Sequence, residues 1–124
     1  MAVTEMNYVE MAGGVDLTNP DYKLPSGFSN IANNATVSVT GLTKKPKYII
    51  ISLARNGSSS TYLGYALLVD VENEAILRVG GLSNATVVDG TQPYSDWVQN
   101  VTSTGFTFTN LSGSYATGQI CVYY

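Results

Sequence analysis

Short apolar segments alternate with turn-forming residues along most of the chain, from residue 31 to its end. The longest apolar segment covers residues 47–53, in which three isoleucines follow one another. Residues branched at Cβ have stiff side chains that pack well on a pleated surface, and this run is short for a core helix. Because its apolar residues fall on both side-chain parities, we predict a central strand over residues 47–54, buried on both faces.

The remaining apolar segments also have the pattern of strands. Residues 36–40 alternate apolar and polar positions, and in residues 106–109 two phenylalanines share one face while two threonines share the other. One helical turn, capped by Ser95, is expected within residues 92–96. The predicted strands cover residues 36–40, 47–54, 62–71, 74–79, 86–88, 97–101, 106–108 and 119–124, with turns between them at sites such as 89–90. Strands this short predict an all-β fold, a single antiparallel β-sandwich of jelly-roll or Ig-like type.

Residues 1–30 lack this regular pattern. Gly13-Gly14 interrupts any regular element, and Asn19-Pro20 favours extended or turning backbone. We predict an N-terminal arm over residues 1–30 with little core of its own, followed by a sandwich domain over residues 31–124. The apolar side chains of the arm would lie in water unless another subunit or protein covers them, so they are the predicted partner-binding residues. They are Val3, Met6, Tyr8, Val9, Met11, Val15 and Leu17. A helix over residues 4–11 packed on its own domain is the alternative.

Composition limits the classes of function. The 124 residues suffice for one domain, and the single cysteine, Cys121, excludes an internal disulfide and is expected to be a small buried hydrophobic residue. A net charge of −3 argues against nucleic-acid binding, because no basic surface attracts phosphate. Lys44, Lys45 and Lys47 cluster beside Pro46 and are expected in a solvated turn. No apolar stretch approaches the ~20 residues of a transmembrane helix, and no signal peptide is recognisable.

The chain contains no histidine, which excludes Ser-His-Asp and Cys-His catalytic arrangements and the commonest transition-metal ligand. Neither of the common glycine-rich phosphate-binding motifs is present. Asp70, Glu72 and Glu74 occupy alternate positions around a predicted hairpin and are the remaining candidates for catalysis or for a calcium site. Their simpler role is to keep the hairpin tip soluble. We therefore predict no catalytic residue, no metal site and no cofactor.

Nine tyrosines and one tryptophan raise the possibility of carbohydrate binding. Aromatic faces stack on sugar rings, and polar side chains in nearby loops supply hydrogen bonds. Tyr94, Trp97 and Tyr115 lie in or beside predicted loops and are the candidate glycan-binding residues. The other interpretation places Trp97 in the core and packs the loop tyrosines against it or against a neighbouring subunit, since tyrosine is also common in protein interfaces.

Both ends of the chain and its central strand resemble a known group of proteins. The opening Met1-Ala-Val-Thr-Glu-Met-Asn-Tyr-Val-Glu10, followed by Gly13-Gly14, resembles the start of small virion proteins from phages of Gram-positive bacteria. Residues 104–112 and the closing segment 119–124 resemble the last hairpin of β-sandwich modules in phage fibre tips and head-associated proteins. Residues 45–53 resemble the early core strand of such modules.

The resemblance implies a structural component of a bacteriophage particle, without catalytic residues. We expect a non-enzymatic capsid decoration or head-fibre protein that is made in the host cytoplasm and located in the virion. It would dock through its N-terminal arm on the major capsid protein or another virion protein, and form a homo-oligomer. The alternative function is a tail-tip or baseplate receptor-binding module that recognises a host cell-surface glycan.

Overall fold

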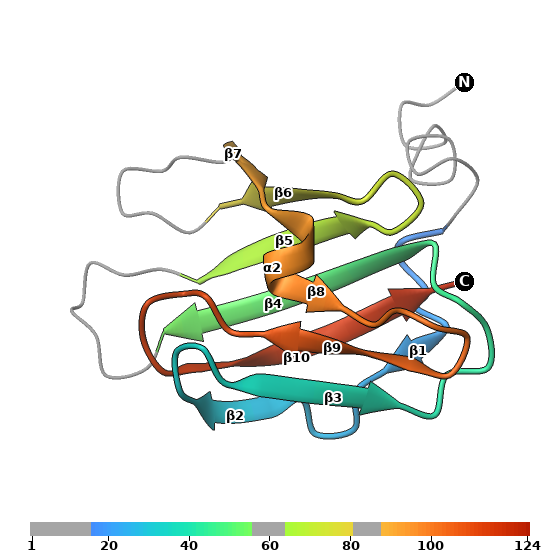
Figure 1. The fold of residues 1–124 in the computed structure, drawn as a ribbon, viewed down its shortest axis with the longest axis horizontal. Coiled ribbons are helices and arrows are strands. Elements are labelled where there is room, and N and C mark those ends of the chain that lie inside the picture. The colour runs from blue at the N-terminus through green and yellow to red at the C-terminus, as the bar shows by residue number, and fades with distance from the viewer. Residues whose placement is uncertain (1–15, 56–63, 81–87) are drawn as a thin grey trace.

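Two antiparallel sheets pack on one another in the computed structural model, which describes residues 16–55, 64–80 and 88–124 (Figure 1). The large sheet has the order β1-β10-β4-β5-β6-β7, with β2 also paired to β10, and the small sheet has the order β3-β9-β8. The large sheet consists of β1 (Tyr22–Lys23), β2 (Phe28–Ile31), β4 (Tyr48–Arg55), β5 (Tyr65–Asp70), β6 (Ala75–Val79), β7 (Val88–Gln92) and β10 (Ala116–Tyr123). The small sheet consists of β3 (Thr36–Thr40), β8 (Val98–Gln99) and β9 (Gly105–Thr109). The predicted all-β sandwich is confirmed.

Strand β4 lies in the interior of the large sheet, paired with β10 on one side and β5 on the other. Ile49, Ile51 and Leu53 on this strand are buried, because they face the small sheet. Ile50 is only half-buried and Ser52 is exposed, on the opposite face. The position of the predicted central strand is therefore confirmed, but the prediction that both of its faces are buried is wrong.

Aromatic side chains from both sheets meet at the middle of the core. Phe108 of β9 stacks nearly parallel on Trp97, with ring centroids 5.9 Å apart and an interplanar angle of 15°. On another side its ring is tilted against Phe28 of β2, at a centroid distance of 5.4 Å. Offset and tilted aromatic pairs contribute stability beyond the area they bury. The Phe108 ring thus contacts both the large sheet, at Phe28, and helix residue Trp97, within the core that the two sheets share.

Residues 16–30 lie in the sandwich, which differs from the prediction of an extended arm with little core of its own. Tyr22 and Lys23 pair with β10, and the Leu24 amide donates to the Ile120 carbonyl at 3.0 Å. Phe28 is 5% exposed and belongs to the core. The turns expected around the prolines of this segment connect short strands, so extended backbone here forms part of a sheet. Residues 1–15 of the predicted arm lie outside the described residues.

A buried asparagine joins the connections of the two sheets. Asn110 is fully buried, and its side-chain nitrogen lies 3.1 Å from the Ile31 carbonyl, 3.1 Å from that of Ala32 and 2.9 Å from that of Ser114. Its side-chain oxygen accepts from the Ser112 amide at 3.0 Å. Buried polar groups of this kind are tolerated only when they are hydrogen-bonded. Asn110 therefore holds the β2–β3 and β9–β10 connections together.

Two details near the last strands differ from the prediction. Residues 89–90, predicted as a turn, lie within β7, whose pairing with β6 shifts register between Leu77 and Val79. The helical turn is present as α2 (Tyr94–Trp97), but Pro93 precedes it and no side chain caps it, so Ser95 is not a cap. The predicted hairpin of residues 97–108 is present as the β8–β9 pair.

Candidate functional site

The large sheet carries a row of apolar side chains on the face turned away from the core. Cys121, Ile50, Leu68 and Leu77 are successive cross-strand partners on β10, β4, β5 and β6. Their sequence neighbours Ile49, Leu67 and Ile76 are buried in the core, so the alternation of a strand directs this row outward. All four side chains are half-buried. Together with Tyr48 and Tyr123 they make up what we call the apolar outer face.

The described part of the chain begins at this face. Tyr123 is only 3% exposed and packs with Leu17, Tyr48, Ile50 and Cys121 in a cluster separate from the main core. The Tyr123 hydroxyl donates to the Leu17 carbonyl at 3.0 Å. Burial is the main cause that raises the pKa of Tyr123, and nearby acidic groups add to it. Leu17 is thus the one predicted partner-binding residue that the structure describes, and it lies on the apolar outer face. The other members, Val3, Met6, Tyr8, Val9, Met11 and Val15, lie outside the described residues.

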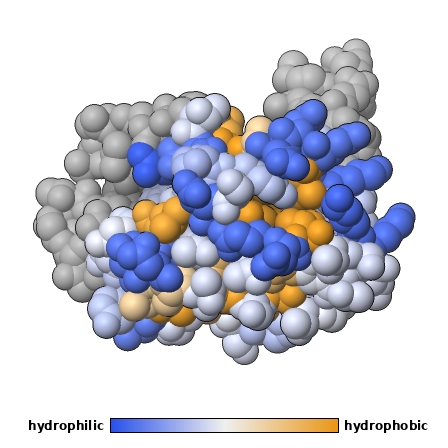
Figure 2. Space-filling model, viewed as in Figure 1, coloured by the Kyte–Doolittle hydropathy of each residue, from blue (hydrophilic) through white to orange (hydrophobic). Residues whose placement is uncertain are grey.

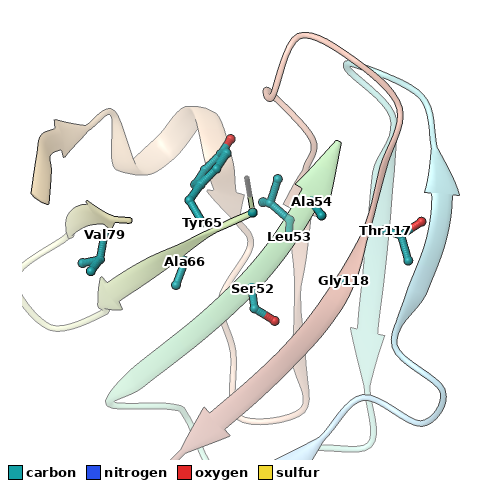
Figure 3. A pocket seen from close by; sticks show the side chains of 9 residues that line it. Ser52, Leu53, Ala54, Tyr65, Ala66, Val79, Thr117 and Gly118 are labelled. Atoms are coloured by element: carbon teal, nitrogen blue, oxygen red, sulfur yellow. The ribbon is translucent and has the colours of Figure 1, made fainter. Parts of the chain in front are cut away.

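Beyond this row, the large sheet is hollowed where its side chains are small. A shallow hollow of about 490 Å³ is lined by Ser52, Leu53, Ala54, Gly64, Tyr65, Ala66, Val79, Thr117 and Gly118. Figure 3 shows Ser52 and Ala66 on one side of the strands and Leu53 and Tyr65 on the other. Gly118 is required here, because a Cβ atom would lie 1.9 Å from the Ser52 carbonyl oxygen and 2.7 Å from the Phe28 ring. On the outer side of the sheet, beyond the apolar row, this hollow is bordered by the small side chains of Ser52, Ala54 and Ala66.

The outer face of the small sheet has the opposite chemistry. Its outward positions, read from the registered pairs, are Thr36, Ser38, Thr40, Gln99, Thr107 and Thr109. Hydroxyl groups hydrogen-bond readily to water, so this face needs no cover. Figure 2 shows it from the same side as Figure 1, and its lower part is mostly pale because threonine and serine have intermediate hydropathy. We call these six residues the hydroxyl face.

A groove opens at the end of the sandwich where the β3–β4 connection, the β5–β6 turn and α2 come together. We call it the Tyr94 groove, and it is lined by Lys45, Val71, Glu74, Tyr94, Ser95, Val98, Gln99, Asn100 and Val101, with a volume of about 340 Å³. A second hollow of about 370 Å³ shares Lys45, Val71 and Glu74 and adds Pro46, Lys47 and Glu72. Volumes of this size are in the range of small-ligand sites. Figure 2 shows hydrophilic residues gathered at this end, with apolar residues visible between them.

Backbone and side-chain hydrogen bonds fix the walls of the Tyr94 groove. The Val71 amide donates to the Lys47 carbonyl at 3.0 Å, which ties the β5–β6 turn to the β3–β4 connection. The Gln99 side-chain nitrogen donates to the carbonyls of Ser95 at 2.9 Å and Asp96 at 2.7 Å, closing the end of α2. The Gln99 side-chain oxygen accepts from the Thr109 hydroxyl at 3.0 Å. A wall fixed in this way loses little conformational freedom when a ligand binds.

The structure separates the three predicted glycan-binding residues. Trp97 is 2% exposed and stacks on Phe108 in the core, so its ring has no free face for a sugar. Tyr115 is 53% exposed, in the loop between β9 and β10, and does not line the Tyr94 groove. Tyr94 does line it, and is half-buried. Burial raises the pKa of Tyr94, and the negative charges of Glu74 and then Asp70 raise it further.

The three predicted carboxylate candidates, Asp70, Glu72 and Glu74, also have different surroundings. Asp70 is engaged in the turn, where it accepts from the Asn73 side chain at 2.8 Å and from the Asn73 amide at 3.2 Å. Glu74 lines the Tyr94 groove and also the hollow of about 370 Å³ beside it, whereas Glu72 lines that second hollow and not the groove. Over residues 16–55, 64–80 and 88–124, no three acidic or cysteine side chains are grouped in a way that could hold a metal ion.

Sequence reasoning missed Lys45, Ser95 and Asn100 as groove residues. Asn100 has a positive φ of 57°, a conformation that asparagine adopts more readily than most residues. That conformation directs the chain out of β8, so it shapes this part of the groove. The asparagine itself was the available signal, since it follows a short strand and precedes a turn.

No family model, no curated protein and no solved structure matches this sequence. Within the described residues, no helix is long and apolar enough to cross a membrane.

Proposed function

We propose that this protein is a non-enzymatic structural component of a bacteriophage particle, of capsid decoration or head-fibre type. The single observation that carries the proposal is the apolar outer face, which begins at Leu17, where the leading residues join the sandwich. A decoration protein needs a stable body and a surface that becomes fully buried on docking. The sandwich supplies the body, and the apolar outer face supplies such a surface.

The energetics favour a docked state for this face. Burying apolar surface stabilises by roughly 25 cal/mol per Å², and the four side chains of the apolar row, each half-buried, still have apolar surface that a partner can cover. The apolar row crosses four adjacent strands, β10, β4, β5 and β6. Neighbouring strands are about 4.8 Å apart, so the row is roughly 14 Å long. A partner that covers it excludes water from four apolar side chains at once.

The leading residues extend the same docking surface. Residues 1–15 carry six of the seven predicted partner-binding residues. Leu17, which follows this segment in the chain, lies on the apolar outer face. A fully extended segment of this length reaches roughly 50 Å. That reach exceeds the span of the apolar row, so the segment and the face can contact the major capsid protein or another virion protein together. Several copies docked in this way around a symmetric particle would form the expected homo-oligomer.

The proposal is tested with two variants and one matched control. Deletion of residues 1–15 leaves Leu17 and β1 in place, and Leu68→Lys adds a charge to the apolar row; Thr107→Lys adds the same charge to the hydroxyl face. Each variant is supplied during assembly, and its amount per purified particle is measured by quantitative mass spectrometry. We expect the first two to be depleted from particles and Thr107→Lys to be incorporated normally. Normal incorporation of both the deletion and Leu68→Lys would contradict the proposal.

A further inference from the structure

The Tyr94 groove collects polar side chains that have no partner in the described part of the protein. The ammonium of Lys45, the carboxylate of Glu74, the hydroxyls of Tyr94 and Ser95 and the amide of Asn100 all line it. Among residues 16–55, 64–80 and 88–124, none of these five side chains takes part in a hydrogen bond or an ion pair. By contrast, Gln99 in the same wall uses both ends of its amide within the protein. The groove thus presents solvent-facing donors and acceptors, of which Lys45, Glu74, Ser95 and Asn100 are exposed and Tyr94 is half-buried, on a backbone held by hydrogen bonds.

The kinds of group present define the ligand. Lys45 provides a positive charge and Glu74 a negative one, so an anion meets repulsion from Glu74 and a cation meets repulsion from Lys45. Hydroxyl and amide groups both donate and accept hydrogen bonds. Val71, Val98 and Val101 supply apolar surface between these polar groups. The best-matched ligand is neutral, carries many hydroxyls and has apolar C–H faces.

We propose that the Tyr94 groove binds a neutral saccharide. The half-buried Tyr94 ring packs against the C–H face of a sugar ring, while Lys45, Glu74 and Asn100 hydrogen-bond to its hydroxyls. The second hollow continues past Glu74 to Lys47 and Glu72 and accommodates a neighbouring sugar unit. Burial, and after it the charge of Glu74, raises the pKa of Tyr94 above its ordinary value of 10.0, so its hydroxyl is a donor at neutral pH, as that of an unshifted tyrosine also is.

This inference goes beyond docking on a particle and is independent of it. The Tyr94 groove shares no residue with the apolar outer face, so a saccharide at the end of the sandwich and a protein partner on its large sheet use different side chains. A particle-bound copy would then present the groove to a glycan. Failure of sugar binding would leave the docking proposal unaffected, and failure of docking would leave the groove unaffected.

The test is an NMR titration of the full-length ¹⁵N-labelled protein with neutral disaccharides, namely lactose, maltose and N,N′-diacetylchitobiose. Galacturonic acid and glucosamine serve as anionic and cationic probes. We expect at least one neutral sugar to shift the amide signals of residues around Glu74, Tyr94 and Asn100 in a saturable way. The charged probes should bind more weakly than the neutral sugars.

Three variants locate the binding site. Glu74→Gln removes the charge with little change of shape, and Asn100→Gly removes the amide while keeping the positive φ that the turn requires. Each should weaken binding roughly five- to tenfold, the effect of one hydrogen bond. Tyr94→Ala should abolish it, and the first two variants keep the test valid if Tyr94→Ala fails to fold. Tyr115→Ala, which removes an exposed tyrosine outside the groove, is the matched control and should bind normally.

Three outcomes would overturn the inference. The first is no saturable shift with any of the three neutral sugars. The second is a set of shifts centred on the Tyr115 loop, with binding lost in Tyr115→Ala and retained in Glu74→Gln. The third is tighter binding of galacturonic acid or glucosamine than of the neutral sugars, which would assign a charged ligand to the groove.

Discussion

The two sheets of the sandwich share one core but differ in their outer faces. On the large sheet, cross-strand partners on the outside are Cys121, Ile50, Leu68 and Leu77. On the small sheet, the corresponding positions are threonines, a serine and a glutamine. In both sheets, outward residues alternate with buried ones along antiparallel strands. Strand structure alone therefore does not require the outward residues of the large sheet to be apolar. The outer face of the small sheet is thus suited to water, whereas the large sheet keeps an apolar outer face, which is the surface that we propose for docking.

The comparison assumes that both sheets pack on one core. Substitution of Phe108 should have the largest effect on that packing. Phe108→Ala removes the ring that contacts both Trp97 and Phe28, so it should lower the free energy of unfolding by about 3–5 kcal/mol. Its neighbour Thr107 points to the hydroxyl face, and Thr107→Ala should change that free energy by about 0.5 kcal/mol or less. Chemical denaturation of the two variants measures both. Equal losses would mean that the inward and outward sides of β9 are wrongly assigned.

The join between the sheets should be nearly as sensitive. Asn110→Ala leaves buried carbonyls of the two connections without their donor, so we expect a loss of about 2–3 kcal/mol in the free energy of unfolding. Asn33 lies in the same pair of connections but is exposed, and within the described residues its side chain accepts one hydrogen bond, from the Gly113 amide. Asn33→Ala is therefore the matched control, with an expected loss of about 0.5–1 kcal/mol. A thermal melt in which both variants behave alike would contradict the role given to Asn110.

Exchanging apolar and polar residues between the two outer faces tests directly whether the faces have different roles. The double variant Leu68→Thr and Leu77→Thr makes the large sheet resemble the small one, and should cost only about 1–2 kcal/mol in stability because both side chains are half-buried. The reverse variant, Ser38→Leu and Thr107→Leu, should fold but self-associate. Sedimentation velocity over a range of concentrations checks the second expectation. Particle incorporation should be lost in the first variant and retained in the second.

The smallest expected effect concerns pH at the Leu17 contact. Because burial raises the pKa of Tyr123 in the folded state above its ordinary value of 10.0, folding favours the neutral phenol. This contribution to stability is fully present below pH 10 and is lost as the pH rises through the raised pKa. Tyr123→Phe removes it, so the stability of the variant should fall less steeply above pH 10 than that of the parent protein. Urea denaturation at several pH values measures the two slopes, and parallel slopes would rule out the effect.

Much of the fold was predictable because period-two patterning and turn residues are local signals. Residues 36–40 were placed correctly as a strand, and the two threonines of residues 106–109 already indicated the hydroxyl face. The sequence of β4 did not show which of its apolar residues lies in the core. That assignment follows from cross-strand pairing with β5 and β10, which joins residues far apart in the chain. The same reason hid the strands that begin before residue 31, since β1 and β2 pair with β10, which lies at the other end of the described chain.

The candidate sites were predictable only in part. Leu17 was named as an apolar residue in need of cover, and in the structure it packs against Tyr123 of its own chain. Tyr94 was named as an aromatic residue near a loop, and it does line a groove; binding of a partner or a glycan by either residue stays a prediction. Trp97 was misleading as a glycan-binding candidate because a large aromatic residue next to a loop can equally close a core. The Tyr94 groove draws Lys45, Glu74 and Asn100 from three separate connections. No local pattern links such positions, because only the packing of the two sheets brings them together.

The natural thiol of Cys121 gives the most direct test of the apolar outer face as a docking surface. The rate of its reaction with a maleimide is measured in the free protein and in purified particles that contain it. The control is Ser38→Cys in a Cys121→Ser background, which places the only thiol on the hydroxyl face. Because burial raises the pKa of the Cys121 thiol, we predict that it reacts more slowly than the control thiol in the free protein and is further protected in particles, while the thiol at position 38 reacts equally in both. Equal reaction of Cys121 in the two states would contradict the account.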